Sequence, residues 1–599
     1  MKLSSCMFTR RLFATTILGI CVCGASAMAA APAYHPINPT MENRTVTLTG
    51  HNLTIEEIVA VARYGAKVQY GPGVVEAASD ARELKLEAGA ENIPVYGLNR
   101  GAGALREVTK KESEPETSVP PWLNGGVLPE VMDEEIVRAA MLISANTAVY
   151  ASGVPEALQM MLDVLNKRLT PVAYARGTLG EADFPAVADD IQSMLGGHGE
   201  AYLKGVRMPS AQALKQAGLK GKETGLGGGG GAENAYGDAL AALLVADGQA
   251  ALEWADLLNA MTKLGMNSSL TPMVTPNQAK RPFKWVNWDA ARTLDILKGS
   301  YLFDGDQRIL QDPESMRASY IRQGSAWQAW ARLRDNVLLQ VNSADLNPMA
   351  IVGASPEDSW ELSTPQFMKY YVKGGPLSHG KHGYVFSTAN WDPYPMVNEI
   401  ESFTNALANA DAAIAQRIER FTDRGPTAFF TGIKPKDVLN QHQINQSPAL
   451  SEPYFVFMDL WAEIQNLSRG VTPEGNAADE GVADIEAFTR IKATRGREVV
   501  DLTMQLMAYD LLASTYWMDV RKAENAKREF GQAPTAVWAE FRKGVPWQMD
   551  VMKRPEIPYG VVAYNFLKAM PASHFYPGGP GMPDADDPQN HSFKGGAGR

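Results

Sequence analysis

Apolar positions recur at three- and four-residue spacing along most of the chain, and this pattern predicts helices. The expected helices cover residues 133–146, 155–169, 239–264, 396–421 and 485–518. Strand signals between them are few, so the pattern predicts an all-α long-helix bundle with a small mixed N-terminal region. The long helices are apolar on most sides, which suggests either helices shared between subunits or the core of a large monomer.

The first 29 residues have a different pattern from the rest of the chain. Thr9-Arg10-Arg11-Leu12-Phe13 precedes a short apolar run, and small residues follow up to Ala29. This order is typical of a cleaved export signal, and the apolar run is too short to span a bilayer. The paired arginines resemble a twin-arginine signal, and an ordinary secretory signal is the alternative. We therefore expect a periplasmic protein.

Composition narrows the possible partners and chemistry of the mature chain. All three cysteines, Cys6, Cys21 and Cys23, lie in the export signal, so no disulfide, thiolate ligand or cysteine nucleophile is expected afterwards. The net charge of −11 argues against nucleic acid and anionic membranes as partners. No second apolar run approaches membrane length, so we expect a soluble protein.

The segments between the predicted helices suggest how the chain is divided into regions. We expect an N-terminal region over residues 30–240, a central long-helix bundle over 241–530 and a C-terminal extension over 531–599. The chain after about residue 575 is rich in glycine, proline and aspartate, which predicts a disordered tail.

Several short motifs occur in order between roughly residues 45 and 520: Tyr96-Gly97-Leu98-Asn99, the Gly177–Gly199 segment, Gln311-Asp312-Pro313-Glu314-Ser315-Met316-Arg317, Asn347-Pro348 and Asn390-Trp391. Together they resemble the aromatic amino acid lyases, the histidine and phenylalanine ammonia-lyase family. The resemblance implies an all-α fold of the ammonia-lyase/fumarase type and a small-molecule substrate. It also implies a homotetramer in which three subunits build each active site.

The segment Gly180-Glu181-Ala182-Asp183 departs from the family pattern. The family has Gly-Ala-Ser-Gly there, and its Ala-Ser-Gly cyclises into an electrophilic imidazolone, MIO. That reaction needs a serine hydroxyl that leaves as water, and Ala182 has none. We therefore expect no MIO. The family's supporting residues are also changed: its asparagine falls on Gly229, with Asn234 as a nearby substitute, its histidine near Asn124 and its tyrosine on Glu314.

Two functional positions of the family are kept. Tyr96 matches the loop tyrosine that serves as base, although a packing tyrosine at a turn is the alternative. Arg317 matches the arginine that clamps the substrate carboxylate, a role that suits the planar guanidinium fork; an ion pair with Asp312 or Glu314 is the alternative. The resemblance adds two further substrate-contact candidates, Asn390 and Glu480, the latter alternatively a charged turn residue.

One interpretation is a lyase that works without MIO. A substrate with a more acidic proton or a better leaving group does not need the electrophile. Tyr96 could take the proton, and Glu181, Asp183 or Glu314 could protonate the leaving atom if burial keeps one of them neutral. Glu181 and Asp183 could equally be solvated acids at a helix start. An isomerase with the same base is a variant of this interpretation.

Two other interpretations stay open. A divalent metal could polarise the substrate, held by Glu181, Asp183, Glu314 and a histidine. The candidate histidines are His379, His382 and His442, with surface histidines on a glycine-rich loop as the alternative. The third interpretation is a non-catalytic periplasmic binder of a small carboxylic acid.

Overall fold

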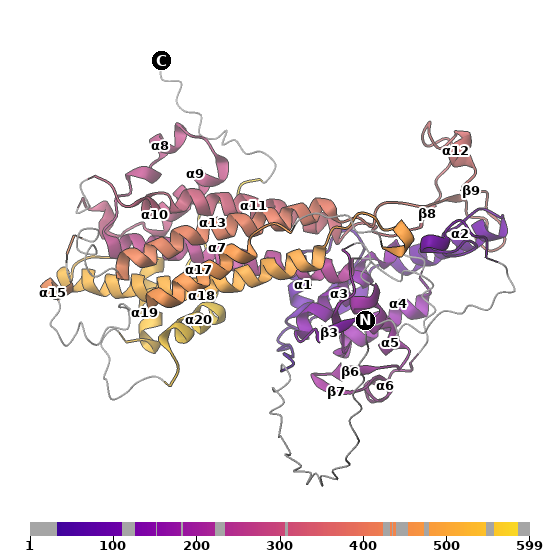
Figure 1. Cartoon of the computed structure of the whole chain (residues 1–599), viewed down its shortest axis with the longest axis horizontal. Coiled ribbons are helices and arrows are strands. Elements are labelled where there is room, and N and C mark those ends of the chain that lie inside the picture. The colour runs from indigo at the N-terminus through magenta and orange to yellow at the C-terminus, as the bar shows by residue number, and fades with distance from the viewer. Residues whose placement is uncertain are drawn as a thin grey trace, which may run out of the picture.

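Long helices form most of the computed structural model, which describes residues 33–110, 126–150, 153–180, 184–221, 234–305, 310–422, 432–433, 435–438, 453–471, 478–546 and 556–584. The bundle consists of α7 (Ala235–Met266), α9 (Lys284–Ile296), α11 (Ser319–Gln340), α13 (Tyr394–Thr422), α17 (Pro453–Leu467) and α18 (Thr489–Glu524). These helices lie side by side along the long axis of the molecule (Figure 1). The predicted long-helix bundle is confirmed.

Contacts between the long helices show their directions. Residue numbers rise together in the pairs of α7, α13 and α18, which are Leu244 with Gly496, Thr262 with Asp510, Thr404 with Gly496 and Arg417 with Asp510. Residue numbers change in opposite senses in the pairs of α11, which are Trp330 with Val245, Gln323 with Asp256 and Ser319 with Arg417. Therefore α7, α13 and α18 run parallel to one another, and α11 runs antiparallel to them.

Smaller elements surround the bundle. The helices among them are α8 (Thr275–Ala279), α10 (Glu314–Arg317), α12 (Pro365–Met368), α15 (Pro435–Val438), α19 (Gln532–Gly544), α20 (Tyr559–Ala569) and α21 (Ala572–Phe575). Figure 1 shows α8, α9 and α10 at one end of the long helices and α12 beyond the other end.

The N-terminal region mixes helices and short strands, as predicted. Its helices are α1 (Ile55–Ala62), α2 (Val74–Ala90), α3 (Glu134–Asn146), α4 (Pro155–Asn166), α5 (Asp189–Leu195) and α6 (Ser210–Ala217). The parallel pair β1 (Thr45–Leu48) and β2 (Lys67–Tyr70) is accompanied by antiparallel pairing of β3 (Val127–Glu130) with β5 (Tyr174–Arg176), and by the sheet β4 (Leu169–Pro171), β6 (Glu200–Leu203) and β7 (Val206–Pro209).

An arm extends from this region and has a small core of its own. Helix α2 packs against an antiparallel sheet of β8 (Met349–Val352), β10 (Gly383–Phe386) and β9 (Tyr371–Val372). The arm core contains Leu84, Ala88, Ile93, Val95, Val372 and Val385. Because Ile93 and Val95 directly precede Tyr96, the arm supports the loop that carries this tyrosine.

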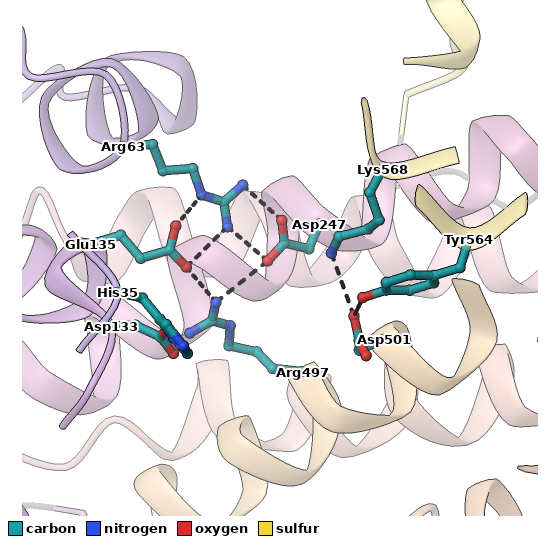
Figure 2. A network of polar contacts seen from close by, with 9 residues as sticks. All are labelled: His35, Arg63, Asp133, Glu135, Asp247, Arg497, Asp501, Tyr564 and Lys568. Carbon is teal, nitrogen blue, oxygen red and sulfur yellow. Dashed lines mark hydrogen bonds and ion pairs between the residues drawn. The ribbon is translucent and has the colours of Figure 1, made fainter. Parts of the chain in front are cut away.

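An ion network ties the N-terminal region to the bundle (Figure 2). Arg63, at the end of α1, pairs with Glu135 of α3 at 2.5 Å and with Asp247 of α7 at 2.7 Å. Arg497 of α18 pairs with the same Glu135 at 2.6 Å. Burial alone would raise the pKa of Asp247, but Arg63 and Arg497 hold that pKa below its ordinary value. Four separate helices are therefore held in register by two cations and two anions.

The described chain continues past residue 575, where the sequence predicts a disordered tail. The hydroxyl of Tyr576 donates to Asp295 at 2.6 Å, and the indole of Trp288 donates to the carbonyl of Pro580 at 3.0 Å. The segment up to residue 584 is thus bound to α9. Among the described residues, no helix combines the length and apolarity that crossing a membrane requires.

Candidate active site

The amino ends of three long helices lie at the same end of the bundle, because α7, α13 and α18 are parallel. Helix α7 begins after Asn234, α13 shortly after Asn390, and α18 after Phe488. The first turn of a helix has backbone N–H groups without intrahelical partners, and the helix dipole is positive there. This end of the bundle therefore favours negative charge.

Asn234 and Asn390 come together at these helix ends. Asn234 is fully buried, and its amide nitrogen donates to the carbonyl of Trp391, the neighbour of Asn390, at 2.6 Å. Its backbone N–H donates to Asp345 at 3.2 Å. The side-chain oxygen of Asn234 is buried and has no hydrogen-bond partner among the residues that the structure describes. Asn390, the residue before Trp391, is exposed, whereas this acceptor of Asn234 is buried.

The chain before Glu181 touches the amino end of α18. The carbonyl of Leu179 accepts a hydrogen bond from Phe488 at 2.8 Å, and the carbonyl of Gly180 accepts one from the Thr489 hydroxyl at 3.2 Å. Gly180 has φ +96°, and a Cβ there would lie 2.5 Å from the Phe488 nitrogen, so glycine is required. The structure thus fixes the residue directly before Glu181 at the α18 amino end.

Four of the predicted residues lie outside the described residues: Glu181, Asp183, Asn124 and His442. The described chain ends before the first two at Gly180, which lies beside the Thr489 nitrogen.

Tyr96 lies on a tight loop after α2. The ring is half-buried, and the phenolic oxygen accepts a hydrogen bond from the backbone N–H of Gly103 at 2.9 Å. The side chain of Asn99 closes the loop by accepting from the Val95 N–H at 2.7 Å. One hydrogen bond therefore holds the phenol, and another closes the loop that carries it.

Glu480 is a neighbour of the Tyr96 loop. The short helix η1 (Gly103–Leu105), which follows Tyr96, packs against η7 (Asp479–Gly481). Glu480 is exposed and has φ +56°, a left-handed conformation that few residues other than glycine adopt. The structure brings these two candidates into one neighbourhood, although neighbouring positions had not been predicted for them.

Two carboxyl groups that sequence reasoning missed begin α5, a few residues after Asp183. Burial raises the pKa of Asp189 to about 6 and that of Asp190 to about 7. Asp190 also accepts a hydrogen bond from the backbone of Tyr174 at 2.9 Å, which opposes the rise. A carboxyl that keeps its proton near neutral pH can act as an acid. In the sequence these two residues are an acidic pair before an apolar helix. Solvated acids at a helix start give the same pattern, so the sequence does not single the pair out.

Arg317 and Glu314 lie on the one-turn helix α10. Arg317 is half-buried, and its buried Nε has no hydrogen-bond partner among the described residues. Glu314 is exposed and lines a cavity of about 470 Å³ whose other charged lining residues are Arg322 and Arg420. The alternative role for Arg317 was an ion pair with Glu314 or Asp312. Neither pair is present among the described residues.

Helix α10 lies at the far end of the bundle from Asn234 and Gly180. It contacts Lys263 near the carboxyl end of α7, whereas Asn234 is at the amino end of the same helix. With a rise of about 1.5 Å per residue, these two points are roughly 40 Å apart. Within one chain, Glu314 and Arg317 therefore lie at the opposite end of α7 from Asn234. They are at this end because α10 precedes α11, which runs antiparallel to α7.

The histidines of the metal interpretation are on the arm. His379 is exposed, with its Nε2 3.8 Å from Glu83, and His382 lies beside Tyr371. Within the described parts of the chain, no group of three histidine, cysteine, aspartate or glutamate residues could hold a metal ion. Neither histidine lies with Glu314, because the arm and α10 are at opposite ends of the molecule (Figure 1).

Comparisons with known proteins agree with this fold. The family model "Aromatic amino acid lyase" matches residues 53–543. A histidine ammonia-lyase from Treponema denticola is 30% identical over 543 residues, which cover 86% of this chain and 97% of that protein. A histidine ammonia-lyase from Stigmatella aurantiaca is 27% identical over 523 residues, covering 84% and 93%. The chain belongs to the aromatic amino acid lyase family.

Solved structures show the same fold. The ergothioneine-degrading enzyme ergothionase from Treponema denticola superposes with a TM-score of 0.72 at 22% identity, over 88% of this chain and 99% of that one. The phenylalanine aminomutase from Pantoea agglomerans gives 0.73 at 17% identity, also over 88% and 99%.

Proposed function

We propose that this protein is a carbon–heteroatom lyase that acts on an amino acid or a related small carboxylic acid without MIO. The residues present do not fit MIO, because Ala182 stands where the family has the serine and has no hydroxyl to lose. The proposal rests on the two site residues that the chain retains, Tyr96 and Arg317. Tyr96 is held in a defined loop, and the buried Nε of Arg317 has no hydrogen-bond partner in the described part of the chain.

The proposed reaction needs no oxidant or reductant. Tyr96, acting as the base, removes a proton from the carbon next to the one that bears the leaving group. The electron pair of that C–H bond forms the C=C bond, and the pair of the breaking C–N bond departs with the nitrogen. A quaternary ammonium group leaves as a neutral amine and needs no further proton, so it is the leaving group that suits a site without an electrophile.

The remaining candidates take roles around this step. Arg317 clamps the carboxylate through two parallel charge-assisted hydrogen bonds. Asn234 offers a buried open acceptor, with Asn390 beside it, and Glu480 and Asn124 complete the substrate-binding set. Where the leaving atom needs a proton, Glu181, Asp183, Glu314 or the newly found Asp190 supplies it.

We further propose that the active site is shared between subunits of a homotetramer. The roughly 40 Å along α7 that separate Asn234 from the α10 contact prevent one chain from completing the site. A neighbouring copy that packs its bundle antiparallel would bring its Arg317 to the Tyr96 end of this chain.

A substrate panel tests the function. The purified protein is incubated with L-histidine, L-phenylalanine, L-tyrosine and ergothioneine, the last because a structural neighbour degrades it and its nitrogen is quaternary. Depletion and new products are measured by mass spectrometry. We expect turnover that Tyr96→Phe lowers about 100-fold or more, with ligand affinity kept. We expect Arg317→Met to raise KM about 10-fold or more.

Other outcomes separate the alternatives. Tight binding of one compound without turnover would favour the non-catalytic binder, and a rearranged product of equal mass would favour the isomerase. Loss of activity on metal chelation, restored by a divalent ion, would favour the metal-dependent lyase. The peptide that contains residues 181–183 should have its unmodified mass, and a loss of water there would contradict the absence of MIO.

We also propose export to the periplasm through the segment 1–29, which lies outside the described residues. Fractionation followed by N-terminal sequencing should find a chain that begins after Ala29. Replacement of Arg10 and Arg11 by lysine should stop export by the twin-arginine route and leave a general secretory route intact.

A further inference from the structure

A buried lysine contacts the short helix that carries Arg317. Lys263 of α7 is 1% exposed, and its Nζ donates to the carbonyl of Met316 at 2.6 Å. Met316 is the penultimate residue of α10, and the last carbonyls of a helix have no partner within it. A cation at the carboxyl end of a helix satisfies such a carbonyl and interacts favourably with the dipole.

Charged groups surround the buried amine of Lys263. Burial, together with the nearby Arg417, lowers the pKa of Lys263 to about 8, although Asp312 and Asp289 oppose the decrease. Asp312 lies two residues before the start of α10 and accepts a hydrogen bond from the Ser269 backbone at 2.9 Å. Burying an ammonium group costs free energy unless the group is paired. Packing alone therefore does not explain a lysine at this position against α10.

A second buried cation reaches the same helix through a serine. The hydroxyl of Ser319 donates to the carbonyl of Ser315 at 2.6 Å, and Arg417 of α13 donates to that hydroxyl at 2.7 Å. Two successive carbonyls of α10 are thus held from two helices of the bundle. The one-turn helix is too short to keep its conformation alone, and these contacts hold it.

We propose that Lys263 is a positioning residue that fixes α10, so that Arg317 presents its guanidinium to the substrate carboxylate; this role rests on the proposed function of Arg317. Lys263 itself touches no substrate, since its side chain is closed off from solvent. The alternative is a purely structural lysine whose loss weakens the whole bundle without a particular effect on α10.

Hydrogen exchange of α10 tests the positioning without any substrate. The amides of Met316, Arg317 and Ala318 are hydrogen-bonded within the turn, so their exchange reports its opening. In the full-length protein, Lys263→Met should raise exchange of residues 316–318 at least 10-fold and leave residues 239–245, at the other end of α7, unchanged. The matched control is Lys298→Met, an exposed lysine of the same size. Lys263→Arg should restore slow exchange.

Kinetics on the substrate found in the panel then test the link to Arg317. Lys263→Met should raise KM about 10-fold and change kcat less than 3-fold, whereas a general loss of structure would lower kcat and active protein together. If Lys263→Met fails to fold, Ser319→Ala removes the second contact and should speed exchange in the same residues.

The outcomes are distinct from those of the proposed function. Unchanged exchange at residues 316–318, or an equal increase at 239–245, overturns the positioning role whether or not a substrate is known. Faster amide exchange in α10 with an unchanged KM overturns the link to the carboxylate. Failure of the lyase proposal would show instead as wild-type protein that turns over nothing in the panel.

Discussion

Asp411 is a buried acid whose protonation should make stability depend on pH. Its side chain is fully buried on α13 and accepts a hydrogen bond from Thr503 at 2.7 Å. Burial raises its pKa from 3.8 to about 8, with Thr503 and Arg417 opposing. The folded state therefore keeps a proton that the unfolded state releases between these two values. Stability should fall as pH rises through this window, by up to about 1.4 kcal/mol per pH unit.

The variant Asp411→Asn removes this dependence. We expect its free energy of unfolding to increase relative to that of wild type from pH 5 to pH 8, because the amide stays neutral in both states and only the wild type loses stability. Chemical denaturation at several pH values measures the difference. Asp304→Asn, at an exposed residue, is the control. A difference from wild type that stays constant with pH would mean that Asp411 is ionised in the folded protein.

At the scale of residues, the sequence can nominate a candidate only where a local motif carries it. Tyr96 and Arg317 could be proposed because their neighbours form recognisable short motifs. Asp190 and Lys263 could not, since their properties come from burial by segments distant in sequence. Asn234 was proposed only as a substitute for a lost asparagine, and the structure adds its open acceptor beside Trp391.

At the scale of elements, the ion network of Figure 2 holds α1 and α3 against α7 and α18. Arg63→Met should leave Asp247 and Glu135 with only Arg497 as a cation and cost about 2 kcal/mol, less than a fully buried pair because these side chains are partly exposed. Urea denaturation measures the loss.

The companion variant Asp247→Asn distinguishes pairing from simple truncation. In the Arg63→Met background it should cost less than in wild type, since the partner charge is already gone. Equal costs in both backgrounds would show that Arg63 and Asp247 contribute independently.

Helix positions followed from local periodicity, but their ends and directions did not. The predicted helix 239–264 lies within α7, and the prediction 485–518 became Thr489–Glu524. The later start has a physical cause: Phe488 has φ +54° and binds Leu179, a residue more than 300 positions away in sequence. The parallel arrangement of α7, α13 and α18 depends on such long-range contacts, which periodicity cannot reveal.

For the whole molecule, the separation of the two halves of the candidate site makes a prediction about assembly. Helix α10, which carries Arg317, and α2, which precedes the Tyr96 loop, lie at opposite ends of the molecule (Figure 1), so each site takes the two residues from different copies if both are needed. Tyr96→Phe and Arg317→Met proteins should each be nearly inactive alone. Co-expressed with different tags and purified as mixed oligomers, they should regain activity, because some sites combine an intact tyrosine from one chain with an intact arginine from the other.

The size of this recovery follows from counting. With random mixing at equal amounts, half of the chains supply an intact tyrosine and half an intact arginine, so about a quarter of the sites are complete in a closed symmetric oligomer. The double variant Tyr96→Phe/Arg317→Met mixed with wild type is the control. It should also leave about a quarter of sites intact if the residues come from separate chains, but half if they come from one. No recovery from the two single variants, together with half of the sites intact in the control, would mean that both residues act within one chain and would contradict the shared site.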